Sequence, residues 1–219
     1  MKSIRLATLS VLLLAAFTAR AESLVANGSL NGSIANMDVP TGWTVLEGTP
    51  DTMDPTSNVG VSGWLSFGVA PTVSPDGGTW VGLGIDGSYI ERFGQTLSGL
   101  TIGQTYTVSW QAANFGVNNA SNSYLGSNAI GVMLDGVSIG QGATLSLSSN
   151  WSTESLTFVA TSTSQLLSFS LAGTDKAYLG IDGISVTAGG VTPAVPEPAT
   201  WALMAIGLVG VGAMRRRQG

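Results

Sequence analysis

The 219-residue chain contains neither cysteine nor histidine. Without cysteine there is no disulfide and no thiol chemistry, so core packing or a bound metal ion has to stabilise the fold. Without histidine the chain lacks the commonest general acid or base and the commonest zinc ligand. A serine–histidine–aspartate triad is therefore excluded, and catalysis would have to use carboxylates or a lysine.

Charged residues are few as well, and basic ones are almost absent from the middle of the chain. They make up 10% of the sequence, and between residues 22 and 196 only Arg92 and Lys176 are basic, against twelve acidic residues. This balance argues against nucleic acid or anionic lipid as a partner of that part. It favours neutral ligands and divalent cations.

The acidic residues do not form a catalytic motif. Glu91 lies near Asp86 in sequence, and Asp51 shares a polar segment with Asp54. Two acidic residues spaced as Asp51 and Asp54 are in a polar loop are usually solvated. Sequence alone gives no separation between carboxylates, which is what a glycoside hydrolase mechanism depends on. The sequence therefore predicts a protein that is not an enzyme, with a glycoside-active enzyme as the less favoured alternative.

The first 21 residues have the three parts of a secretory signal peptide. Lys2 and Arg5 precede an apolar run over residues 9–17, and Ala19 and Ala21 form a small-x-small cleavage site. A membrane-spanning helix is less favoured, because the apolar run is short and a cleavage site follows it. We expect export, with a mature chain that begins at Glu22.

The last residues have a tripartite pattern of their own. Pro196, Glu197 and Pro198 precede an uncharged apolar run over 199–214, and Arg215, Arg216 and Arg217 follow it. An apolar run followed by basic residues predicts a short hydrophobic helix that inserts in a membrane with its basic end in the cytoplasm. The run is shorter than the ~20 residues that usually span a bilayer, which favours temporary residence.

This tail resembles the PEP-CTERM sorting signal of exported bacterial proteins. The resemblance implies recognition by an exosortase, a membrane transpeptidase-like enzyme, and removal of the tail near the motif. The alternatives are a plain C-terminal membrane anchor and a buried core helix, but an arginine triplet rarely follows a core helix.

The segment between the two terminal signals predicts one all-β domain. Short β-rich runs alternate with Gly and Asn turns, as in a β-sandwich. The clearest strand is 104–113, where Tyr106, Val108, Trp110 and Ala112 alternate with polar residues. We expect a signal peptide at 1–21, a single jelly-roll-type antiparallel sandwich at 22–188, a Gly/Pro linker at 189–195 and the sorting signal at 196–219.

Three Asp-Gly pairs mark turns or irregularities in these strands. The pair at 86–87 predicts a hairpin between 79–85 and 90–97, and the pair at 135–136 predicts one between 129–134 and 137–139. The third, at 182–183, interrupts a strand over 178–187 and predicts a bulge rather than a reversal. Segments 47–63 and 114–128 lack periodicity and are expected to be long loops.

The body also resembles the galactose-binding-like β-sandwich of many carbohydrate-binding modules. The resemblance rests on residues 24–30, 40–43, 78–81, 95–106 and 179–186. It implies a jelly roll, carbohydrate binding and a structural calcium that ties the first strand to the last. Asp182 occupies the matching place in the last strand, but the usual acidic partner after Asn-Gly-Ser is replaced by Leu30 and Asn31. Asp182 is therefore either a calcium ligand or a bulge carboxylate bonded to nearby backbone.

Sugar-binding sites place aromatic rings on sugar faces and surround them with polar groups. The candidates in or beside the expected loops are Trp64, Tyr89, Asn114, Phe115 and Tyr124. Their alternative role is structural, since aromatic residues at strand ends often cover a core and Asn often forms turns. Four further aromatic residues are assigned to the core: Trp43, Trp80, Trp110 and Phe158.

Together these features predict an exported, non-enzymatic surface or extracellular-matrix protein. Its tail gives transient membrane association, an exosortase processes it, and extracellular polysaccharide is the expected ligand. The alternative is a structural matrix component that binds no small ligand.

Overall fold

The computed structural model describes residues 22–57, 66–118 and 122–189. The expected signal peptide, Trp64 and the sorting signal lie outside this part of the chain. Over the described residues the secondary structure consists of strands without an α-helix. The strands are β1 (Thr44–Glu47), β2 (Asp51–Met53), β3 (Ser66–Phe67), β4 (Trp80–Asp86), β5 (Tyr89–Ile90), β6 (Arg92–Ser98), β7 (Thr105–Ala113), β8 (Val117–Asn118), β9 (Ser123–Tyr124), β10 (Ile130–Leu134), β11 (Val137–Gln141), β12 (Ser152–Val159), β13 (Ser164–Leu171) and β14 (Ala177–Ala188).

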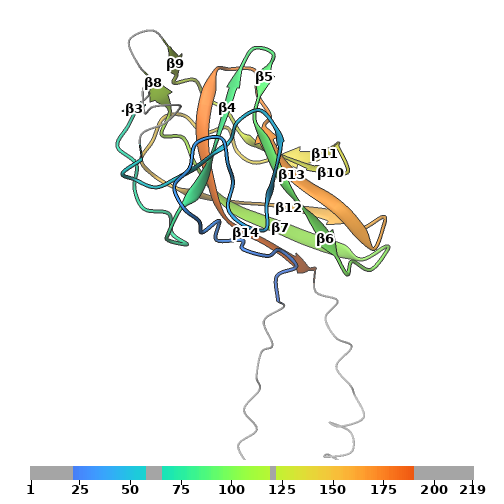
Figure 1. The fold of residues 1–219 in the computed structure, drawn as a ribbon. Helices are drawn as coiled ribbons and strands as arrows, with labels where there is room; N and C mark the ends of the chain where they lie inside the picture. The colour runs from blue at the N-terminus through green and yellow to red at the C-terminus, as the bar shows by residue number, and fades with distance from the viewer. Residues whose placement is uncertain (1–21, 58–65, 119–121, 190–219) are drawn as a thin grey trace, which may run out of the picture.

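Two antiparallel sheets pack face to face, so the expected all-β sandwich is confirmed (Figure 1). One sheet has the order β1-β6-β13-β10-β11, and the other has the order β12-β7-β14-β4-β2 with β5 added to β4. A small third sheet, β3-β8-β9, lies at one end of the molecule. Neighbouring strands are mostly far apart in sequence, which means that tertiary packing specifies most of the pairing.

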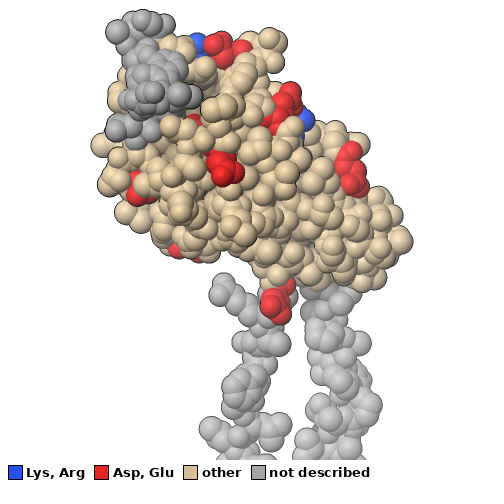
Figure 2. Space-filling view, viewed as in Figure 1, with Lys and Arg blue, Asp and Glu red and all other residues tan. Residues whose placement is uncertain are grey.

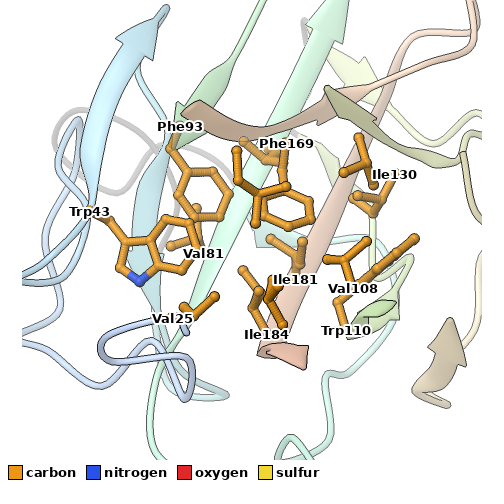
Figure 3. Close-up of a cluster of buried hydrophobic side chains, with 14 of the residues drawn as sticks. Val25, Trp43, Val81, Phe93, Val108, Trp110, Ile130, Phe169, Ile181 and Ile184 are labelled. Atoms are coloured by element: carbon orange, nitrogen blue, oxygen red, sulfur yellow. The ribbon is translucent and has the colours of Figure 1, made fainter. Parts of the chain in front are cut away.

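Side chains from both sheets interdigitate in the main core (Figure 3). The alternation along β7 is confirmed, because Tyr106, Val108, Trp110 and Ala112 are all buried. Trp110 packs edge-on against Phe169 of the opposite sheet, with ring centroids 6.1 Å apart. The four aromatic residues assigned to the core are buried too, although Trp80 belongs to a second cluster on the other face of the six-stranded sheet.

The second and third Asp-Gly pairs have the predicted structures. Asp135 and Gly136 form a tight turn between β10 and β11, both with positive φ (50° and 78°), which is the backbone of a type I′ hairpin. At the third pair β14 continues, but its register against β7 shifts between Asp182 and Ser185. Gly183 has φ 57° there, so the predicted bulge is confirmed.

The hairpin predicted at Asp86 and Gly87 is wrong beyond its first residues. After the turn, only the short strand β5 pairs with β4. From Arg92 onward the chain crosses to the other sheet and β6 pairs with β1 and β13. The crossing lets Phe93 and Leu97 bury their side chains in the core from the opposite side.

The two segments expected to be long loops contain short strands. Within 47–63, β2 is fully buried and pairs with β4, while its Thr52 exchanges two backbone hydrogen bonds with Ala35 on the other side. Within 114–128, β8 and β9 form a hairpin. None of these three strands shows sequence periodicity, because each has only two or three residues. β2 and β8 also pair with the sequence-distant strands β4 and β3.

Both ends of the described body leave from one end of the sandwich (Figure 1). The backbone N–H of Leu24 donates to the Val186 carbonyl, and that of Gly189 donates to the Thr105 carbonyl. The β5 and β9 hairpins lie at the opposite end. Among the described residues there is no helix long and apolar enough to cross a membrane.

Candidate functional site

Two of the predicted ligand residues, Tyr89 and Tyr124, are brought to the same end of the sandwich. Tyr89 lies on β5 and is 38% exposed, and the ring of Tyr124 on β9 lies 4.4 Å from the ammonium of Lys176. Lys176 also donates to Asp86 Oδ2 at 2.7 Å, and Asp86 pairs with Tyr89 across the hairpin. We call Asp86, Tyr89, Tyr124 and Lys176 the tyrosine rim.

The structure places the other predicted aromatic residue, Phe115, in the interior instead of on a rim. It is 2% exposed and lies over the outer face of the six-stranded sheet. Its ring centroid is 5.7 Å from that of Trp80 and 5.4 Å from that of Trp151, in tilted and edge-on geometries. These contacts make Phe115 part of a second apolar core.

Asn114 is also buried, at 1% exposure, because it joins three segments of backbone. Its Nδ2 donates to the carbonyls of Gly126 and Leu145, each at 2.9 Å, and its backbone carbonyl accepts from the Ser148 N–H. In this arrangement Asn114 holds the β7–β9 region together and does not reach the surface.

A buried acidic network lies beside the tyrosine rim. Glu91 is 4% exposed, and its Oε1 accepts hydrogen bonds from Tyr89 Oη at 2.7 Å and Thr49 Oγ1 at 3.2 Å. Its Oε2 accepts from the Gly84 N–H at 2.5 Å. Burial raises the pKa of Glu91 to about 7, helped by the nearby charge of Asp51 and opposed by these hydrogen bonds.

Asp51 and Tyr178 form the second half of this network. Asp51 Oδ2 accepts from Tyr178 Oη at 2.7 Å, and its Oδ1 accepts from the Met37 N–H at 2.8 Å. Burial raises the pKa of Asp51, and the two hydrogen bonds oppose that rise. The Tyr178 ring fits over β4 because Gly82 has no side chain there.

Sequence reasoning missed this network and treated Asp51 as solvated. The only local sign is the Gly82-x-Gly84 spacing on β4, which leaves room on one face of the strand for Tyr178 and Glu91. Since the carboxylate oxygens of Asp51 and Glu91 are occupied and the side chains are enclosed, the network can hold β2 and the β4–β5 hairpin in place. It offers no open carboxylate pair to a substrate.

Asp182 lies at the β14 bulge and is completely buried. Neither of its carboxylate oxygens has a hydrogen-bond partner of normal geometry. Burial raises the pKa of Asp182 to about 7; the nearby Ser74 hydroxyl and Gly183 N–H lower it, and the Asp76 carboxylate raises it. An enclosed, unpaired carboxylate is costly unless something compensates it.

A hard cation with oxygen ligands fits this carboxylate. The loop that carries Asp76 packs against the bulge, since a Cβ added to Gly183 would lie 3.4 Å from the Asp76 Cβ. Within the described ranges there is no group of three or more Asp or Glu side chains that could hold a metal. A calcium ion here would therefore use Asp182 together with backbone carbonyls and neutral oxygens.

The comparison with protein families decides the nature of the tail. Residues 194–217 match the PEP-CTERM protein-sorting motif. The match contains the predicted motif residues Pro196 to Pro198 and the arginine triplet, so the resemblance seen in the sequence is confirmed. This motif indicates an exported protein that is processed at the membrane, and it is the recognition signal of an exosortase. A search of curated proteins finds no match.

Solved structures support the fold of the body. A cyclase from Fischerella sp. TAU, solved with 4-(1H-indol-3-yl)butan-2-one, is similar at TM-score 0.55 and 16% identity, over 78% of this chain and 98% of that one. The arabinose-bound MgGH51 α-L-arabinofuranosidase is similar at TM-score 0.50 and 14% identity, over 77% of this chain and 26% of that one. This chain thus spans about a quarter of the arabinofuranosidase and nearly all of the cyclase.

Carbohydrate-binding modules are also among the structural neighbours. One example is TmCBM61 in complex with β-1,4-galactotriose, at TM-score 0.43 and 13% identity, over 68% of this chain and 90% of that one. At such identities, likeness between structures shows a shared fold alone.

Proposed function

We propose that this chain is an exported, non-enzymatic protein of the cell surface or extracellular matrix, delivered by its PEP-CTERM tail. The observation that carries the proposal is the sorting motif at 194–217, which begins only a few residues after β14 completes a self-contained sandwich. An exosortase cuts near Pro196–Pro198 and separates the sandwich from its apolar helix and arginine triplet. The domain limits follow as 22–188 for the sandwich and 189–195 for the linker.

The ligand class that fits the sandwich best is extracellular polysaccharide, bound at the tyrosine rim. Tyr89 presents a partly exposed ring, and Lys176 and Asp86 are charged hydrogen-bonding groups beside it. A neutral sugar needs this combination of an aromatic surface and polar partners. The strongly acidic body disfavours anionic partners.

The acidic network supports a non-enzymatic role. Glu91 has the raised pKa that a general acid needs, but Tyr89, Thr49 and the Gly84 N–H occupy its oxygens and 4% of the residue is exposed. A substrate could reach the carboxylate only if the β4–β5 hairpin opened. We therefore assign Glu91 to folding stability rather than to catalysis.

A glycan array probed with the secreted protein tests the ligand. We expect binding to one class of neutral polysaccharide, with at least a tenfold loss in Tyr124→Ala because a ring contact is removed. Trp64→Ala is the second variant, since Trp64 was predicted to contact the ligand as well. Val137→Ala, an exposed residue distant from the rim in the fold, is the matched control and should bind normally.

The second candidate function is a structural matrix component that binds no small ligand. This function is supported if the protein binds no glycan on the array but still accumulates in the extracellular matrix. Hydrolysis of any glycan that is abolished by Glu91→Gln would instead establish an enzyme.

A further inference from the structure

A hollow opens between the free edges of the two sheets. It has a volume of about 480 Å³ and lies between β11, at one edge of the five-stranded sheet, and β12, at one edge of the six-stranded sheet. Its apolar lining includes Val137, Ile139 and Val159. Val137 is 68% exposed and Val159 is 54% exposed, so both leave apolar surface in water.

A third exposed apolar side chain lies next to this hollow. Ile102, in the turn between β6 and β7, is 64% exposed. The N–H of the following residue, Gly103, donates to the Ala160 carbonyl at 2.8 Å, directly after Val159. We call Ile102, Val137, Ile139 and Val159 the apolar end; a cluster of this kind on a soluble domain usually marks an interaction surface.

The apolar end carries almost no charge. The segments 98–104 and 159–165, which form its turns, contain no charged residue. Asp135 is the only charged residue that lines the hollow, and its oxygens accept from the Leu166 N–H at 2.8 Å and Gln165 Nε2 at 2.9 Å. In Figure 2 the acidic side chains are scattered over the visible face of the body. Glu22, at the start of the described body, is an exposed acid at the end where the chain leaves, so it is the turns themselves that are uncharged.

The chain leaves the sandwich at this same end. The N–H of Gly189 donates to the Thr105 carbonyl, and Gln104 Nε2 donates to the Gly189 carbonyl at 2.9 Å. Thr105 pairs with Val159 on its other side, so Gly189 and Val159 flank one strand and lie roughly 10 Å apart at ordinary strand spacing. The apolar run at 199–214 starts ten positions later, within a reach of about 35 Å.

We propose that the apolar end is a docking surface for the lipid bilayer, in use while the tail is still inserted. The inference rests on the proposed sorting function, which puts the 199–214 run in a membrane. The short tether then gives the apolar end a high effective concentration at that membrane. The turns over 98–104 and 159–165 contain no charged residue, so they can approach a lipid surface without desolvating a charge.

Docking in this orientation has a functional consequence. The tyrosine rim lies at the opposite end of the sandwich and faces away from the membrane (Figure 1). Once the tail is removed, three or four small apolar side chains are too few to hold the domain on the bilayer, and it leaves the membrane.

The absence of cysteine makes a direct test simple, because a single introduced cysteine is a unique labelling site. Ile102→Cys, Val137→Cys and the control Ser88→Cys, in the exposed turn at the rim end, are each labelled with an environment-sensitive fluorophore. The chain is purified with its tail from membranes of a host without exosortase and reconstituted in phosphatidylcholine vesicles with brominated acyl chains. We expect quenching at positions 102 and 137 that is at least threefold stronger than at position 88.

Two results would overturn the inference. Equal quenching at all three positions would show that the domain has no preferred end at the membrane. Blue-shifted emission at 102 and 137 without quenching by brominated lipid would mean that protein covers the apolar end, either a second copy or another segment of the chain. Flotation with the vesicles reports tail insertion separately: a chain that fails to float contradicts the sorting proposal too, whereas one that floats without quenching contradicts docking alone.

Discussion

Asp182 is the residue whose surroundings depart most from ordinary protein chemistry. It is fully buried at a bulge in the last strand, and neither carboxylate oxygen has a hydrogen-bond partner of normal geometry, although the Ser74 hydroxyl and the Gly183 N–H lie nearby. Two states relieve this cost, a protonated carboxyl and a bound cation. The resemblance to carbohydrate-binding modules implied the cation, and the orphaned oxygens support it.

We predict that calcium raises the melting temperature of the protein by several degrees relative to EGTA, because the ion binds the folded state alone. Asp182→Asn should abolish this response, whereas Asp86→Asn, at the other end of β4, should retain it. The measurement is a thermal melt by circular dichroism at pH 7.5. An unchanged melting temperature in the parent protein would remove the calcium site.

Glu91 predicts a dependence of stability on pH. Its pKa is raised from 4.5 to about 7 in the folded state, so folding favours the protonated form. The stabilisation is complete below about pH 4.5 and is lost as the pH rises through 7. With EGTA present, we expect the free energy of unfolding to fall by about 3 kcal/mol between pH 4.5 and pH 8 on account of this residue.

Urea titrations at several pH values measure this change. Glu91→Gln should flatten the profile by that amount, while Glu22→Gln, an exposed acid at the start of the body, should leave it unaltered. A Glu91→Gln profile that parallels that of the parent protein would show that Glu91 is not the titrating group.

For the candidate ligand residues, the structure reports exposure, and a place in an expected loop predicted exposure for only some of them. Tyr89 and Tyr124 lie at the same end of the sandwich and are exposed or partly exposed, but Phe115 and Asn114 are buried. A single aromatic or Asn in a polar segment looks the same in sequence whether it covers a core or faces solvent. Phe115 is buried because it packs against Trp80 and Trp151, which are distant from it in the chain.

The packing of β4 depends on two positions without a side chain, Gly82 and Gly84. Gly82 and Gly84 leave one face of it bare, and Tyr178 from β14 covers that face. A Cβ at Gly82 would lie 2.3 Å from Tyr178 Oη and 2.5 Å from its Cε1. The Tyr178 ring can therefore pack on β4 only if residue 82 is glycine.

Gly82→Ala should consequently destabilise the protein by about 2 to 4 kcal/mol, from steric crowding and from loss of the Tyr178–Asp51 hydrogen bond. Urea unfolding measures this change. The double variant Gly82→Ala/Tyr178→Leu should recover part of it, and Ser88→Ala in the exposed turn should be neutral. A loss below 0.5 kcal/mol for Gly82→Ala would contradict the packing described for β4.

Strands with their own periodicity or turn chemistry could be predicted, and the others could not. β7 alternates over nine residues, and the β10–β11 hairpin has an Asp-Gly turn, so both were expected. β2 has three residues and no pattern, and its burial depends on Ala35 and β4. Likewise, β6 crosses to the other sheet because Phe93 and Leu97 pack in the core from that side. The Asp-Gly turn before β6 does not specify this packing.

The sandwich has two unlike ends. One carries the exposed tyrosine rim and the ion pair of Lys176 with Asp86, and the other carries the uncharged apolar turns and the exit of the chain. In the function that we propose, the body is tethered at one end and binds polysaccharide at the other, so it can act both at the membrane and after release. The matched sorting motif follows the exit of the chain by only a few residues.

In the proposed function, the tail is a removable sorting signal on a β-sandwich that folds without it. The intact mass of the protein recovered from the medium of an exosortase-containing host tests it most directly, because the mass reports both ends of the chain at once. We predict a chain that starts at Glu22 and ends close to Pro196–Pro198, without the 199–214 run. A released or surface-bound protein whose mass still includes Arg215 to Arg217 would contradict the claim and leave a plain membrane anchor.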